Sequence, residues 1–92
     1  MHTSEERNAA ARLKICAFEA ADDMGELASL LDAAKENQEL AQVIGDALTQ
    51  SGGPELPDLL VQVAEMRRML NALANRIPIS KTEARSRMLG DL

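Results

Sequence analysis

Two stripes of apolar residues, spaced alternately three and four positions apart, together cover about half of this 92-residue chain. An α-helix brings residues at this spacing onto one side, whereas a β-strand would turn them to alternate faces. Stripes of this kind predict helices that lie lengthwise against other helices. The first stripe is Ala10, Leu13, Ala17, Ala20, Met24, Leu27, Leu31 and Ala34, and the second is Leu56, Leu59, Val63, Met66, Leu70, Leu73 and Ile77.

The composition favours the same all-α architecture. Phe18 is the only aromatic residue, and Ala and Leu are abundant, which suits closely packed helices better than a β-sandwich or barrel. A single cysteine, Cys16, has no partner for an internal disulfide, and its place in a helical apolar stretch predicts a small buried side chain. We therefore predict an antiparallel bundle of three main helices plus a short C-terminal helix.

The limits of these helices follow from capping and loop signals. Thr3 and Ser80 are each followed three residues later by a glutamate, which is the pattern of a capping box. Two glycines and a proline in the segment 51–54 predict a loop, and Pro78 ends the third helix. Gly25 is a weak point in the first helix, but the apolar stripe keeps its phase there, which favours one continuous helix. We expect a single helical domain over residues 1–92, with helices at about 4–36, 38–50, 55–76 and 81–89.

The first helix is expected to carry more apolar surface than its own chain can cover. The helix over 38–50 is long enough to cover only the C-terminal half of the first helix. Leaving Ile15 and Phe18 in water, on the uncovered half, forgoes roughly 1.5–3 kcal/mol for each side chain. A second copy of the chain would complete the bundle by two-fold symmetry, so we expect a homodimer. In the rival arrangement, the third and fourth helices fold back over this surface within one chain. The candidate interface residues are Ala11, Ile15, Phe18 and Met69.

Charge divides the chain into an acidic part and a basic part. Residues 1–65 hold thirteen acidic and four basic residues, whereas residues 66–92 hold six basic and two acidic residues. Such polarity can bring two chains together head to tail, or let the two ends of one chain neutralise each other.

Four carboxylates gather within two turns of the first helix, at Glu19, Asp22, Asp23 and Glu26. Carboxylates four residues apart on facing helices hold Mg²⁺ in all-α nucleotide pyrophosphohydrolases, and oxygen ligands suit this ion. No basic or aromatic pocket for a nucleotide accompanies them, so a solvated acidic docking face is favoured over a metal site.

The sequence offers no catalytic constellation. Its only histidine, His2, lies in a terminal segment, so neither Cys16 nor any serine has an evident base beside it. Cysteine- or histidine-rich metal spacing and a glycine-rich phosphate loop are both missing from the sequence. We expect no enzymatic activity, no cofactor and no bound metal.

The basic segment raises the alternative of nucleic-acid binding, because lysine and arginine neutralise phosphates. The acidic total charge and the absence of aromatic residues for base stacking make nucleic acid a minor alternative. The residues concerned are Arg67, Arg68, Arg76, Lys81, Arg85 and Arg87.

These observations predict a small acidic interaction module without enzymatic activity. No secretion signal or membrane span is evident, so a cytoplasmic location is expected. Our main hypothesis is a regulator or inhibitor, of the kind that phages also encode, that docks on a larger protein through Ile15, Phe18 and the acidic face. The alternative is an export or assembly chaperone that covers a client helix in a long apolar groove.

Overall fold

The computed structural model describes residues 3–90, which form four α-helices and no strand. The helices are α1 (Ser4–Ala34), α2 (Gln38–Gln50), α3 (Leu56–Arg76) and α4 (Lys81–Gly90). The predicted all-α fold is confirmed, and each predicted helix is present with both limits within two residues of the structure. α1 continues through Gly25 without a break, as the phase of its apolar stripe predicted.

Local capping contacts fix where three of the helices begin. The hydroxyl of Thr3 accepts a hydrogen bond from the Glu6 amide at 3.1 Å, and the hydroxyl of Ser80 accepts one from the Glu83 amide at 3.0 Å. The side chain of Asn37 accepts a hydrogen bond from the Leu40 amide at 3.1 Å. Each contact satisfies an amide that the first turn of a helix leaves without a partner, so these starts are set by neighbouring residues alone.

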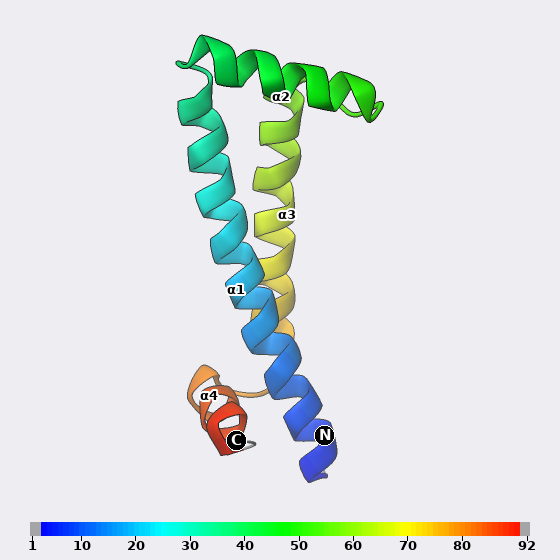
Figure 1. Cartoon of the computed structure of the whole chain (residues 1–92). Coiled ribbons are helices and arrows are strands. Elements are labelled where there is room, and N and C mark those ends of the chain that lie inside the picture. The colour runs from blue at the N-terminus through cyan, green and yellow to red at the C-terminus, as the bar shows by residue number, and fades with distance from the viewer. Residues whose placement is uncertain (1–2, 91–92) are drawn as a thin grey trace.

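α1 and α3 lie antiparallel along most of their lengths and form a long hairpin (Figure 1). The hairpin has two different ends. At its lower end, α4 packs against the N-terminal part of α1, close to the C-terminus of α3. At its upper end, α2 lies across the C-terminal part of α1 and the N-terminal part of α3.

The position of α2 differs from the expectation that it would lie alongside the C-terminal half of α1. That place is taken by α3, which at 21 residues overlaps α1 over a greater length than the 13 residues of α2 could. The longer overlap removes more apolar surface from water, and this favours α3 as the neighbour of α1.

The buried core consists mainly of small side chains. Within the described part of the chain, seven of its nine apolar members are alanines, and the other two are Val63 and Ile79. The large side chains Leu13, Leu27, Met66 and Leu73, which the two stripes placed in the core, are between 40% and 51% exposed. The prediction for these four residues was wrong, because α1 and α3 meet through the small members of the stripes and turn the large ones aside.

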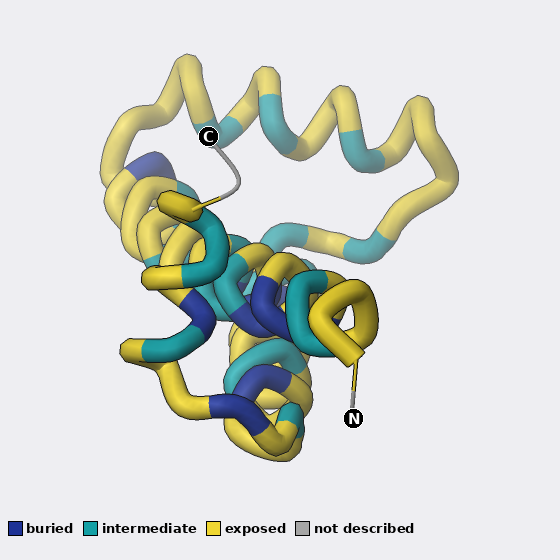
Figure 2. Tube along the Cα trace, turned by 90° about the horizontal axis from the view of Figure 1, so that it is seen from below, coloured by how far each residue is buried: buried dark blue, intermediate teal, exposed yellow. Residues whose placement is uncertain are grey.

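Burial falls off sharply toward the upper end. Figure 2 shows α2 as an exposed helix with a few half-buried positions, and none of its 13 residues is buried. The half-buried positions are Ala41, Ile44 and Leu48, which form one stripe, while Leu40 and Val43 remain exposed.

Cys16 on α1 is also exposed, which corrects the prediction of a buried thiol.

Candidate interaction surfaces

α4 covers much of the N-terminal half of α1. The sequence had predicted that a second copy of the chain would cover this surface. Ala11 is 1% exposed and belongs to a buried cluster with Ile79 and Ala84, and Ile15 packs against that cluster. The fourth helix therefore folds back over this surface within one chain, as the rival arrangement expected. Ala11 and Ile15 therefore supply no argument for an exposed patch in the single chain.

Phe18 is half-buried beside the same junction. Its ring has two cations over it, the Lys14 amine at 5.7 Å and the Lys81 amine at 4.6 Å from the ring centre. Contacts of this kind attract a cation to the electron-rich face of an aromatic ring. Phe18 therefore helps to hold α4 in place. The sequence predicted Phe18 only as an interface residue.

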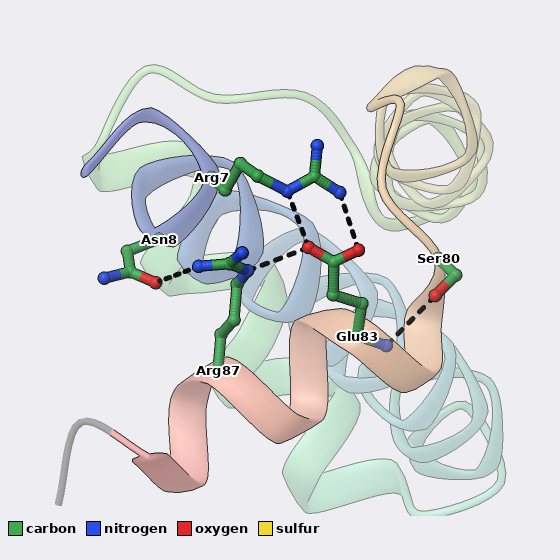
Figure 3. A network of polar contacts seen from close by, with 5 residues as sticks. All are labelled: Arg7, Asn8, Ser80, Glu83 and Arg87. Atoms are coloured by element: carbon green, nitrogen blue, oxygen red, sulfur yellow. Dashed lines mark hydrogen bonds and ion pairs between the residues drawn. The ribbon is translucent and has the colours of Figure 1, made fainter. Parts of the chain in front are cut away.

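A polar network ties α4 to α1 (Figure 3). The carboxylate of Glu83 accepts hydrogen bonds from Arg7 at 2.6 and 2.7 Å and from Arg87 at 2.8 Å. Arg87 also donates to the side-chain oxygen of Asn8 at 3.0 Å. Hydrogen bonds from Arg7, then from Arg87, favour the ionised carboxylate and lower the pKa of Glu83 to about 2.

Lys14 is the one buried charged side chain among the described residues, with 6% exposure. Its amine donates to the backbone oxygens of Ala74 at 2.8 Å and Ile77 at 3.2 Å, at the C-terminus of α3. The last carbonyls of a helix lack partners and carry partial negative charge, so a cation stabilises them. Lys14 was not among the site residues predicted from the sequence. Its place four residues after Ala10 and three before Ala17 is the signal that it shares their buried side.

The four carboxylates of the acidic face are all exposed, on the side of α1 turned away from α3. Leu30 continues the same side, four residues after Glu26, and is 62% exposed. Among residues 3–90, no group of three or more His, Cys, Asp and Glu side chains is arranged to hold a metal ion. His2 lies outside the described residues.

The basic segment is divided among separate places. Arg67 lies against Gly25, where a Cβ atom would be 3.0 Å from the guanidinium carbon of Arg67. Arg87 is held by Glu83, and Lys81 lies over the ring of Phe18. Arg68 lines a shallow depression on the outer side of α3, together with Glu65, Met69 and Ala72. Met69 is 58% exposed there, and neither Ile15 nor Phe18 lines this depression.

The structure reveals a further surface, which we call the open face and define as Leu13, Ala20 and Leu27 of α1 with Met66 and Leu73 of α3. Leu13 lies roughly 200° around α1 from Ala11, which puts it on the side opposite α4. Met66 and Leu73 follow Val63 and Leu70 by three residues, just as Leu13 and Ala20 follow Ala10 and Ala17. In an antiparallel pair, equal offsets from the line of contact turn to the same side. At the lower end of this face, Leu13, Ala10, Ile77 and Pro78 line an apolar depression.

No family model, curated protein or solved structure matches this chain. Among the described residues, no helix is both long enough and apolar enough to cross a membrane.

Proposed function

We propose that this chain is a small non-enzymatic interaction module of the cytoplasm, which regulates or inhibits a larger protein by binding to it and which also binds its own copy. The observation that carries the proposal is the inversion of side-chain size between core and surface. Among residues 3–90, alanines dominate the buried positions, while ten large apolar side chains are exposed. A chain that places large apolar side chains on its surface gains stability when another molecule covers them.

The docking surface for the larger protein is the acidic face together with Leu30. Within residues 3–90, the carboxylates of this face take part in no ion pair, and Leu30, one turn beyond Glu26 on the same side, is 62% exposed. A partner that fits this surface has a basic patch beside an apolar pocket. Charge steers such partners together, and the desolvated leucine supplies affinity at one end of the surface.

The test of this proposal uses the immobilised chain to capture binding partners from an extract, with and without its acidic face. The variant Glu19→Gln, Asp22→Asn, Asp23→Asn, Glu26→Gln removes the charge and keeps the side-chain shape. We expect one partner to bind the unmodified chain and to be lost from this variant. The partner should also dissociate as salt is raised, because screening weakens the attraction.

A matched control carries Glu36→Gln, Glu39→Gln, Glu55→Gln and Asp58→Asn, which remove the same charge from other exposed positions. The control should retain the partner. Equal loss from both variants would show that only total charge matters, and that the acidic face is not a docking surface.

The second candidate is an export or assembly chaperone, and the open face favours it. This face presents large apolar side chains from two helices along the hairpin, as a groove for a client helix would. A chaperone of this kind would lose its client when Leu73 is replaced by glutamate and would retain it when the acidic face is neutralised.

A further inference from the structure

We propose that the open face binds a second copy of this chain, with the two hairpins antiparallel about a two-fold axis that passes beside Ala20. The proposal rests on the proposed function in treating the molecule as one that works by association, and it specifies the surface and register of the self-association. The arrangement joins two hairpins into a bundle of four long helices, in which Leu13, Leu27, Met66 and Leu73 form the shared core.

The surface area of one chain is too large for a compact monomer of its mass. One chain of 10.0 kDa exposes 6612 Å², whereas a compact monomer of this mass exposes about 5,200 Å². Its radius of gyration is 17.4 Å, against about 12 Å for a compact domain of this length. The excess of about 1,400 Å² lies within the range that each partner buries in a permanent dimer.

The spacing of the open face supports a two-fold axis at one particular height. On α1, Leu13 and Leu27 lie seven residues to either side of Ala20, so an axis beside Ala20 sets Leu13 of one copy against Leu27 of the other. The small side chain of Ala20 allows the two α1 helices to approach each other at the axis.

α3 has its own centre of symmetry at the same height. The midpoint of Met66 and Leu73 falls between Met69 and Leu70. Lys14 reaches the backbone of Ala74, and Gly25 lies against Arg67, so interpolation sets Ala20 level with Leu70 to within about half a helical turn. One two-fold axis therefore passes the midpoints of the apolar pairs on both helices. Two unrelated apolar stripes would have no reason to share a midpoint height.

The charge distribution favours the antiparallel arrangement. The lower end, taken as residues 3–14 and 74–90, holds seven basic and three acidic residues, whereas residues 15–73 hold three basic and eleven acidic residues. An antiparallel pair sets the basic lower end of each copy against the acidic part of the other. A parallel pair would bring like charges together, which costs free energy.

Disulfide cross-linking in the full chain tests this register directly. In a Cys16→Ser background, Ala20→Cys should form a disulfide-linked dimer rapidly, because the axis brings the two thiols together. The control Ser29→Cys places an exposed thiol roughly 180° around α1 from Ala20 and should cross-link far more slowly. Leu13→Cys and Leu27→Cys should each form few cross-links alone and many when mixed.

Sedimentation equilibrium provides the second measurement. The unmodified chain should have twice the mass of a 10.0 kDa monomer at micromolar concentration. Leu73→Glu should halve that mass while the circular dichroism remains helical, because Leu73 is 45% exposed in the single chain. The matched change Val61→Glu, at a 56% exposed position on another side of α3, should leave the dimer intact.

Three outcomes would overturn the proposal. They are a monomeric mass for the unmodified chain, equal cross-linking at positions 20 and 29, and self-cross-linking of Leu13→Cys that exceeds the mixed reaction. All of these measurements use the purified chain without a partner protein. Failure of the acidic-face experiment with retention of the dimer would therefore reject the docking surface alone, and a monomer that still binds its partner would reject the dimer alone.

Discussion

The two ends of the hairpin are built in opposite ways. At the lower end, α4 is fixed by a buried apolar cluster and by contacts that join residues far apart in the sequence, such as Arg7 with Glu83. At the upper end, α2 has no buried residue, and its side-chain hydrogen bonds within residues 3–90 are to close neighbours in the sequence. A helix can therefore be well specified by its own residues while its place in the tertiary structure is weakly fixed.

The largest loss of stability is expected when an isoleucine of the lower end is shortened to alanine, and an isoleucine of the upper end provides the comparison. Ile79→Ala, at a residue only 5% exposed in the lower cluster, should lower the free energy of unfolding by about 2–4 kcal/mol because it leaves a cavity. Ile44→Ala, at a half-buried position on α2, should cost less than about 1.5 kcal/mol. Urea unfolding followed by circular dichroism at one protein concentration measures both. Equal losses would contradict the difference between the two ends and show that α2 is buried in solution.

A smaller effect is expected from replacing a lysine at each end. Lys14→Met keeps most of the buried volume but leaves the carbonyls of Ala74 and Ile77 without a donor, which should cost about 1.5–3 kcal/mol. Lys35→Met removes only an exposed ion pair with Asp32 and should cost about 0–0.5 kcal/mol. The same urea experiment applies. A Lys14 variant as stable as the unmodified chain would mean that water replaces its amine at the C-terminus of α3.

The smallest effect is expected from acidification at Glu83. The pKa of Glu83 is lowered to about 2 in the folded chain, from an ordinary value of 4.5, so the native state favours the ionised form. The resulting stability is fully present above about pH 5 and is lost as the pH falls toward about 2. The difference in urea midpoint between the unmodified chain and Glu83→Gln should therefore shrink over this interval. Glu39→Gln at the upper end should show no comparable change, and a constant difference for Glu83→Gln would contradict the assignment.

The sequence predicted the helices because their signals are local. Capping residues such as Thr3 and Ser80 act on amides three positions away, and the apolar stripe showed that α1 continues through Gly25. These features depend on neighbours along the chain, so they can be recognised without knowing how the helices meet.

The packing could not be predicted in the same way. Each stripe is wide enough to include residues that face the neighbouring helix and residues that lie beside that contact. Periodicity alone does not say which residues make the contact. The small residues Ala17 and Ala21 allow α3 to come close, and this choice turned Leu13 and Leu27 outward. The roles of Lys14 and Glu83 depend on partners 60 and 76 positions away, which no local pattern reveals. The acidic face was predicted as an exposed surface and is exposed, but the open face emerged only from the structure.

The contact between Arg7 and Glu83 also bears on how the protein is made. Because 76 positions separate the two residues, α1 emerges from the ribosome long before the helix that covers Ala11 and Ile15 has been translated. During that interval the apolar surface of α1 in the nascent chain is exposed and prone to aggregation. Translation speed near residues 80–90, and any factor that shields α1 until then, should accordingly influence the yield of correctly folded molecules in the cell.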